Sequence, residues 1–501
     1  MSDVKEELQK GAFVNFLGIL GRVSGPGLLI VANQLYGTAT FGIYMTANII
    51  VELTLAFLVS GFKAGNIIFV SRHADDPAEH KRMYQALSTA FVLCVGIGVL
   101  LIALMHLLAP FIFPLVYEPE YADSLIPLLK WMVIMLPFMA FEQLTVSSTQ
   151  GLKTMKFDAI VNGGFKPFFL LLFAVVFYYL DSTVMGLAYG YVVAQFLVFL
   201  YSLYIYTLRF SWKELRLAIR HFKPDIELIR FAIPQNLNTT LNRFTTGVDI
   251  LMLPALGASS LLVGYYATGS LIVREIRHVK LAFSGAFNPH IVRYYKEGDI
   301  KGLSTSFSLT ANWIASITIP IILIIAILRN DLMEWISNAP VEETLFMLFL
   351  LPVPYLYNSF ALAEDIITMT GHSLYTLLNS FLVTIFNVGL NLWLIPEFGL
   401  TGAAMASAMA TFIIVILENI EVRYLTGAKL KFKTVFKPHL AGYIITGIFV
   451  YTQLYHSLLM DSVGERLLLG LYLTIGFALI YILLDFPLVK KRFKKWAEKR
   501  Y

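Results

Sequence analysis

Residues 42–47 read Gly-Ile-Tyr-Met-Thr-Ala, and 222 positions later residues 264–269 read Gly-Tyr-Tyr-Ala-Thr-Gly. The same offset aligns Asn48 with Ser270, and Asn66 with Asn288. Four further pairs keep the order, namely Leu20–Ser24 with Leu241–Thr245, Leu136-Pro137 with Leu351-Pro352, Gly151 with Gly371, and Gly186–Ala188 with Gly402–Ala404. Each match is weak alone, but their common order and near-constant offset predict an internal duplication.

The composition is that of a membrane protein. Hydrophobic residues make up 57% of the 501 positions and charged residues 14%, whereas soluble domains carry about 25% charged residues. Apolar runs recur, each long enough to cross a bilayer with about 20 residues. We predict an all-α polytopic membrane protein with about 14 transmembrane helices, starting near Gly11, Phe41, Tyr84, Leu125, Ala159, Thr183, Leu228, Leu261, Thr305, Glu343, Leu374, Leu400, His439 and Arg466.

The duplication divides these helices. We expect two parallel six-helix repeats, in an N-terminal lobe over 1–208 and a C-terminal lobe over 226–430, joined by a cytoplasmic linker at 209–225. Two extra helices over 431–489 and a basic tail over 490–501 follow. Parallel repeats related by an axis along the membrane normal are typical of transporters whose substrate site lies near the midplane.

The basic residues orient the chain. Lys and Arg gather in alternate connections, whereas the opposite connections hold only Arg329 and Arg466. Because cytoplasmic loops carry the excess of Lys and Arg, both termini are predicted to be cytoplasmic in a multi-pass protein of the inner membrane. The tail from Lys490 to Arg500 is expected to bind anionic lipid. The net charge of +5 is attributed to anchoring at the cytoplasmic side, and no nucleic-acid partner is expected because the sequence contains no soluble basic domain. Cys94 is the only cysteine, which excludes an intramolecular disulfide and a cysteine-based metal site.

Three stretches carry a resemblance to a known family. They are Leu35-Tyr-Gly37 followed by Phe41-Gly-Ile-Tyr44, the charged loop after Phe69-Val-Ser-Arg72, and Asn391-Leu-Trp-Leu-Ile-Pro396 running into the small-residue segment Gly399–Ser407. The chain resembles the polysaccharide-transporter branch of the superfamily that includes multidrug exporters and the lipid II flippase. The resemblance covers the whole chain and implies a V-shaped, two-lobed flippase for polyprenyl-diphosphate-linked oligosaccharides, with polysaccharide assembly proteins as further partners.

Charged side chains at membrane depth are the candidate site. A charge there costs at least about 2.5 kcal/mol and usually faces a bundle interior or a wet cavity. Eight basic residues interrupt the apolar runs: Arg22, Lys63, Lys130, Lys166, Arg243, Arg274, Arg277 and Lys280. Helical spacing groups Asn48, Glu52 and Lys63 on one face, Asn242 and Asp249 beside Arg243 on another, and Arg274 with Arg277 on a third. The basic surplus favours an anionic ligand.

The expected roles follow from these positions. Substrate binding is assigned to Arg22, Arg243, Arg274, Arg277, Glu52, Asn48 and Asn242, because arginine grips diphosphate oxygens and amides bind sugar hydroxyls. Structural pairing remains the alternative, with Glu52 neutralising Arg22 or Arg274. Lys63 and Lys280 are placed at the cavity mouth, Lys130 as an interfacial anchor, and Lys166 in an ion pair with Glu142. Glu364, Asp365 and Asp249 are candidates for a coupling ion.

We therefore expect a flippase that moves a lipid-linked oligosaccharide to the outer leaflet by alternating access, for surface polysaccharide biosynthesis such as that of lipopolysaccharide. A cation-coupled multidrug exporter is one alternative, although a cationic drug would favour carboxylates over arginine. A membrane glycosyltransferase or polymerase is the other, although the short outer loops offer it little room. We expect no enzymatic activity, cofactor or metal, and the sequence contains no glycine-rich ATP-binding loop.

Overall fold

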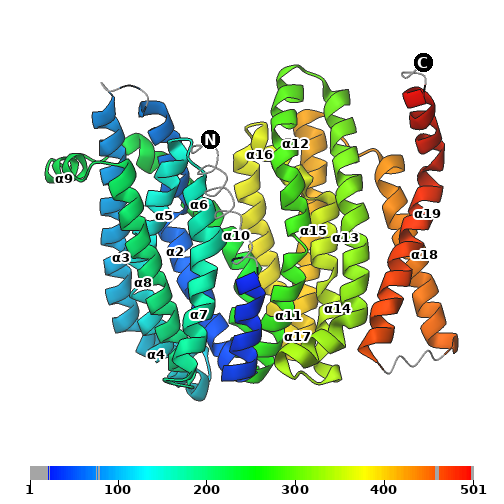
Figure 1. The fold of residues 1–501 in the computed structure, drawn as a ribbon, viewed down its shortest axis with the longest axis horizontal. Coiled ribbons are helices and arrows are strands. Elements are labelled where there is room, and N and C mark those ends of the chain that lie inside the picture. The colour runs from blue at the N-terminus through cyan, green and yellow to red at the C-terminus, as the bar shows by residue number, and fades with distance from the viewer. Residues whose placement is uncertain (1–20, 22, 75, 77–78, 457–461, 498–501) are drawn as a thin grey trace, which may run out of the picture. The chain divides into compact units, whose positions relative to one another are not determined.

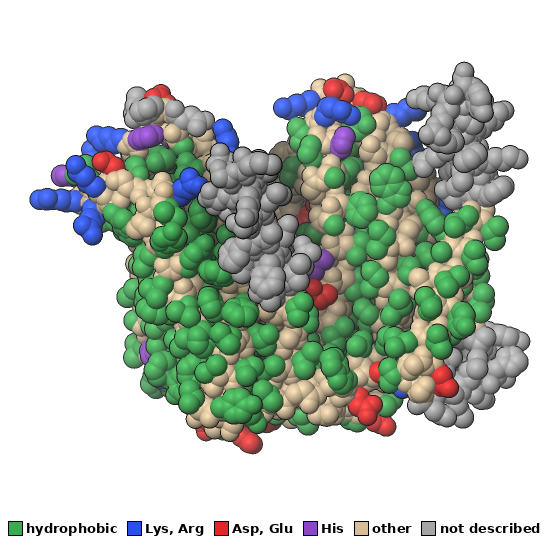
Figure 2. Space-filling view, viewed as in Figure 1, with side chains coloured by type: hydrophobic (Ala, Val, Ile, Leu, Met, Phe, Trp, Pro, Cys, Tyr) green, Lys and Arg blue, Asp and Glu red, His purple; other side chains and the backbone are tan. Residues whose placement is uncertain are grey.

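The computed structural model describes residues 21, 23–74, 76, 79–456 and 462–497, and this part of the chain is helical with no strand (Figure 1). It divides into two compact units, residues 1–267 and 268–501. The all-α prediction is therefore confirmed. In each unit the flanks of the helices are hydrophobic, and Lys and Arg side chains gather at one end (Figure 2).

The first unit contains the helical residues 23–36 and the helices of the first repeat. α10 and the start of α11, which begin the second repeat, also belong to it. Its elements are α2 (Thr38–His73), α3 (His80–Val116), α4 (Pro119–Val133), α5 (Leu136–Gly151), α6 (Lys156–Ile160), the π-helix η1 (Val161–Phe165), α7 (Lys166–Tyr178), α8 (Val184–Arg209), α9 (Trp212–Arg220), α10 (Ile226–Ala255) and α11 (Ser260–Glu275).

The second unit takes up the chain within α11. Its elements are α12 (His278–Lys296), α13 (Ile300–Ser337), the 3-10 helix η2 (Val341–Thr344), α14 (Phe346–Leu350), α15 (Pro352–Phe360), α16 (Leu362–Met369), α17 (Ser373–Thr426), α18 (Phe432–His456) and α19 (Val463–Ala497).

Seven described helical segments are long and apolar enough to cross a membrane, and two bent helix pairs raise that number to nine. The remaining predicted spans correspond to shorter or more polar helices such as α10, so the count of about 14 remains a prediction. The predicted starts at Leu374 and Leu400 both fall in α17, which is kinked at Gly399 with φ 54° and ψ −129°. Only glycine adopts this backbone region readily, so the stretch from Pro396 to Gly399 forms the expected turn between two helices.

Polar side chains start several helices at the predicted connections. Thr183 accepts a hydrogen bond from the Met185 N–H at the start of α8, and Asp225 accepts one from Leu228 at the start of α10. Asp299 does the same for Gly302 in α13. Such caps satisfy backbone N–H groups that have no partner within the helix.

The duplicated glycines bring helices of the first unit into close contact. A Cβ on Gly42 would lie 2.3 Å from the Ser260 carbonyl oxygen, and one on Gly264 would lie 2.0 Å from that of Thr38. Further along α2, a Cβ on Gly61 would lie 2.0 Å from the carbonyl oxygen of Ala232 in α10. The repeat-related residues Gly42 and Gly264 thus lie at one crossing of α2 with α11.

In the second unit α13 is the central helix. Phe307 and Ile314 on α13 pack with Phe287 of α12, Leu362 of α16 and Val422 of α17. On another face of α13, Ala315 and Ile319 pack against α18 and α19 through residues including Ala441, Leu473 and Phe477. The two helices outside the duplication, α18 and α19, therefore belong to this unit and pack against α13.

Candidate functional site

Glu52 on α2 is the anion at the centre of the first unit's charged cluster. Its Oε2 lies 2.5 Å from Arg243 on α10, and its Oε1 lies 3.9 Å from the Lys166 ammonium at the start of α7. The partner expected for Glu52, if it is structurally paired, was Arg22 or Arg274. Arg22 lies outside the described residues, and the structure shows Arg243 bonded to Glu52. Two cations share one carboxylate here, so positive charge exceeds negative charge within this group.

Lys166 was predicted to form an ion pair with Glu142. This prediction is wrong, because the Lys166 ammonium contacts Glu52 instead. Glu142 on α5 is 1% exposed, and neither of its oxygens has a hydrogen-bond partner in the described part of the chain. Lys166 and Lys63 lie within electrostatic range of it. Sequence spacing places Glu142 on a buried face. The rotation of α7 about its axis decides which carboxylate Lys166, at the start of α7, reaches.

A break between α11 and α12 lies among the predicted site residues Arg274, Arg277 and Lys280. Residues 276–277 are not helical, and the chain resumes as α12 at His278. Asn358 of α15, which is fully buried, donates to the Ile276 carbonyl oxygen at 2.8 Å and to Thr318 at 3.0 Å. The Ile276 carbonyl also accepts from the Val279 N–H at 3.2 Å, so Asn358 adds a second and shorter hydrogen bond that stabilises the break. Asn358 was not among the predicted site residues, because an asparagine within an apolar segment carries no charge.

The break positions two cations on one aromatic ring. The Arg277 guanidinium lies 5.0 Å from the centre of the Tyr357 ring, and the Lys280 ammonium lies 4.4 Å from it. Both distances suit cation–π attraction. Arg274 is half-buried at the end of α11. Tyr357 escaped the sequence analysis because an aromatic residue on an apolar helix carries no charge signal.

Lys280 differs from its expected place at a cavity mouth, because it is only 2% exposed. Its ammonium lies 3.5 Å from Glu364 and 3.5 Å from Asp365 on α16. Ser284, one turn further along α12, donates to Asp365 at 2.7 Å. The two carboxylates proposed for a coupling ion therefore hold a lysine ammonium in this structure, and Glu418 on α17 is buried nearby within their electrostatic range.

The other predicted site residues lie in the first unit. Asn48 and Lys63 are half-buried on α2, and Asn242 is exposed on α10. Asp249 is buried and accepts a hydrogen bond of 2.8 Å from Tyr266 on α11. Asp249 lies in the first unit and Glu364 in the second, so these two candidates for a coupling ion belong to separate groups of charges.

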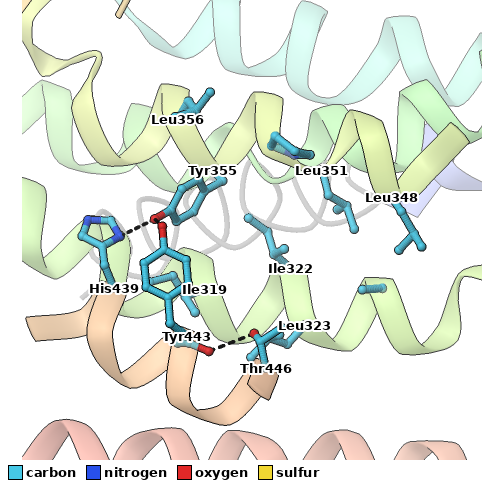
Figure 3. A pocket seen from close by; sticks show the side chains of 13 residues that line it. Ile319, Ile322, Leu323, Leu348, Leu351, Tyr355, Leu356, His439, Tyr443 and Thr446 are labelled. Carbon is cyan, nitrogen blue, oxygen red and sulfur yellow. Dashed lines mark hydrogen bonds between the residues drawn. The ribbon is translucent and has the colours of Figure 1, made fainter. Parts of the chain in front are cut away.

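A cavity of about 440 Å³ lies between α13, α15 and α18 in the second unit. Apolar side chains such as Ile322, Leu323 and Leu351 line it, as Figure 3 shows. At one end Tyr355 is hydrogen-bonded to His439 at 2.7 Å and lies 3.3 Å from the Tyr443 hydroxyl. The cavity thus has long apolar walls and one polar end, and it lies beside the two helices outside the duplication.

Comparison with known proteins places the chain in a family. The polysaccharide biosynthesis protein family matches residues 8–295, which is more than half of the chain. The chain belongs to this family. No curated protein sequence matches it. The family assignment confirms the resemblance, and the matched residues contain the motif around Gly37.

Solved structures extend the assignment from sequence to fold. A structure described as lipid II flippase MurJ in an inward closed conformation aligns with TM-score 0.75 and 14% identity, covering 94% of this chain and 99% of its own. An inward-facing multidrug resistance transporter of the MATE family aligns with TM-score 0.66 and 15% identity, covering 82% and 94%. A MOP superfamily transporter from Pyrococcus furiosus aligns with TM-score 0.54 and 14% identity, covering 82% and 93%. The chain has the fold of these transporters, and the fold class is confirmed.

Proposed function

We propose that this member of the polysaccharide biosynthesis family is a flippase for a polyprenyl-diphosphate-linked oligosaccharide. It would take the lipid from the cytoplasmic leaflet and release its head group outside by alternating access. The family assignment supports a role in polysaccharide biosynthesis. The fold shared with a lipid II flippase supports a lipid-linked substrate. We further propose that the protein acts in the inner membrane with both termini in the cytoplasm, because Lys and Arg gather in alternate connections.

The observation that carries this proposal is the pair of arginines, Arg243 and Arg277, that specific contacts hold among the helices of the two units. Arg243 shares Glu52 with Lys166, so one carboxylate offsets two cations. Arg277 lies against the Tyr357 ring, which leaves its planar fork oriented by packing. Arginine matches phosphate oxygens with two parallel N–H bonds. We assign diphosphate binding to these residues with Arg22 and Arg274, and sugar contacts to Asn48 and Asn242.

The apolar cavity suits the other part of such a substrate. Its walls come from α13, α15 and α18, and its volume is about 440 Å³. Burying a polyprenol tail there gains about 0.8 kcal/mol for each CH₂ group removed from water, but little relative to lipid. We therefore assign the cavity a guiding role, in which it keeps the tail beside the protein while the head group crosses.

Charge supplies part of the driving force. An inside-negative potential favours outward movement of an anion by about 2.3 kcal/mol per charge per 100 mV. We propose that Glu364, Asp365 and Asp249 couple transport to a cation. Because the Lys280 ammonium lies between the first two carboxylates, an incoming cation would have to displace it.

The decisive experiment replaces Arg22, Arg243, Arg274 and Arg277 singly with Ala. Each variant is reconstituted into vesicles, and flipping of a polyprenyl-diphosphate oligosaccharide is measured at equal protein abundance. Lys130→Ala, at another basic residue of the apolar runs, serves as the matched control. We expect transport to fall in the arginine variants and to persist in the control. Normal transport in all four arginine variants would refute the proposal, and loss of folded protein would instead indicate structural pairing.

A multidrug exporter remains the second candidate because two carboxylates, Glu142 and Glu418, are buried within the helices. Buried carboxylates suit a cationic substrate better than an anionic one. The same vesicles distinguish the two functions. Accumulation of a lipophilic cation that depends on Glu142 and Glu418, with no movement of the lipid-linked oligosaccharide, would favour the exporter.

A further inference from the structure

The connection between α8 and α10 forms a short helix with two unlike faces. Lys213, Arg216 and Arg220 are spaced three and four residues apart on α9, so they share one face, and all three are exposed. Trp212, Leu215 and Ile219 follow the same spacing on another face. The exposed Leu217 lies beside the cations, four residues after Lys213, but the other large apolar side chains of α9 are on the opposite side. A helix with a cationic face and an apolar face is typical of a membrane interface.

One half of this helix is docked on the first unit. Leu215 is buried, and the Trp212 ring lies 4.4 Å from Tyr206 and stacks on Phe141 at 6.2 Å. The Ser211 N–H donates to the Tyr84 hydroxyl at 2.8 Å. These contacts with α3, α5 and α8 fix the start of the helix and therefore its direction.

The other half extends beyond the bundle. Figure 1 shows α9 projecting sideways from the first unit, at a large angle to α3 and α8 and below the end of α3. Ile219 is 42% exposed and Phe222 is 37% exposed. The apolar span α8 ends at Arg209, so this level is where lipid headgroups would meet acyl chains. The exposed Ile219 and Phe222 side chains follow shortly after this residue.

We propose that α9 is a docking surface for anionic phospholipid headgroups. Lys213, Arg216 and Arg220 bind the headgroup phosphates, while Ile219 and Phe222 enter the adjoining acyl region. The clustered positive charge favours anionic over zwitterionic lipid, and the exposed apolar pair favours a membrane over a soluble acidic protein. This surface lies outside the residues to which we assign the transported substrate, so it is independent of the proposed function.

The test uses the full chain in vesicles. Ile219→Cys is labelled with a polarity-sensitive apolar fluorophore, and the native Cys94 stays unlabelled because it is buried. Quenching by acrylamide, a neutral water-soluble reagent, is compared between phosphatidylcholine vesicles and vesicles that also contain phosphatidylglycerol. We expect several-fold weaker quenching in the anionic vesicles, and we expect salt to reduce this difference because it screens exposed charges.

A charge-matched pair of variants isolates the surface. In the labelled K213Q/R216Q/R220Q variant, the fluorophore should be quenched equally in both kinds of vesicle. The labelled K296Q/K301Q/K433Q variant lacks three exposed lysines of the second unit, and its fluorophore should keep the difference in quenching. The proposal is overturned if the fluorophore on the helix with its three cations intact is quenched equally in both lipids. It is also overturned if the K213Q/R216Q/R220Q variant keeps the full difference in quenching. Protection that appears only when a soluble protein fraction is added would also overturn it, in favour of a protein partner.

Discussion

Gly61→Ala should loosen the contact between α2 and α10. A Cβ at this position would lie 2.0 Å from the Ala232 carbonyl oxygen and 2.7 Å from its Cα, whereas ordinary contacts begin near 3.4 Å. The two backbones must therefore separate by more than about 1 Å. The separation also weakens the hydrogen bond from the Gly61 N–H to the Asn236 side-chain oxygen.

The expected magnitude combines three effects. Overpacking costs about 1–3 kcal/mol, and the weakened hydrogen bond costs about 1 kcal/mol. Alanine in place of glycine returns about 1 kcal/mol of helix propensity. The net cost of about 1–3 kcal/mol lowers the population of the closed contact relative to the separated state by about 5- to 150-fold.

Cross-linking at one end of the same helices measures this population. Arg72 and Glu227 form an exposed ion pair of 3.0 Å between α2 and the start of α10. Cysteines replacing both residues are joined with a short bifunctional thiol reagent, and the initial rate is recorded. Gly96→Ala in α3 is the control, because nothing lies within 4 Å of its Cβ position. Equal cross-linking rates in the Gly61 and Gly96 variants would refute the packing argument.

Three further predictions concern the second unit. Lys280→Met leaves Glu364 and Asp365 without their shared cation and should destabilise the protein by about 2–3 kcal/mol. The cost is below that of a fully buried pair because both carboxylates are partly exposed. Thermal unfolding in detergent measures the loss, and K280M/E364Q/D365N should recover most of it. Asn358→Ala leaves the Ile276 carbonyl with only the 3.2 Å bond from the Val279 N–H and should cost about 1 kcal/mol, whereas Thr318→Val should cost less. Equal unfolding midpoints in the Asn358 variant and the unmodified protein would contradict our account of the helix break. Ile322→Trp narrows the apolar cavity and should slow flipping of a long polyprenyl substrate more than that of a short-chain analogue, whereas the exposed Leu479→Trp on α19 should affect neither.

The sequence contained the information for the class of fold because its signals are local or periodic. Apolar length predicted helices such as α3, and the motif from Pro396 to Gly399 predicted a turn that only glycine forms without strain. The repeated segment at Gly42 and Gly264 predicted the duplication. These features depend on the chain's own chemistry and require no knowledge of which helix lies beside which.

Partner choice among charged residues required the tertiary structure. The spacing of Glu52, Glu142 and Lys166 allowed more than one ion pair. The packing of α2 against α10 brings Arg243 to Glu52, and the Lys166 side chain reaches the same carboxylate from the start of α7. Lys280 resembled an interfacial lysine in sequence, but α16 brings two carboxylates to it and buries it. A charge at membrane depth faces a bundle interior or a wet cavity, so the sequence by itself identified these residues as candidates for a site and left substrate binding and structural pairing both open. Only the relative rotation of the packed helices decided which partner each one contacts, because side chains reach across a few ångströms and not along the chain.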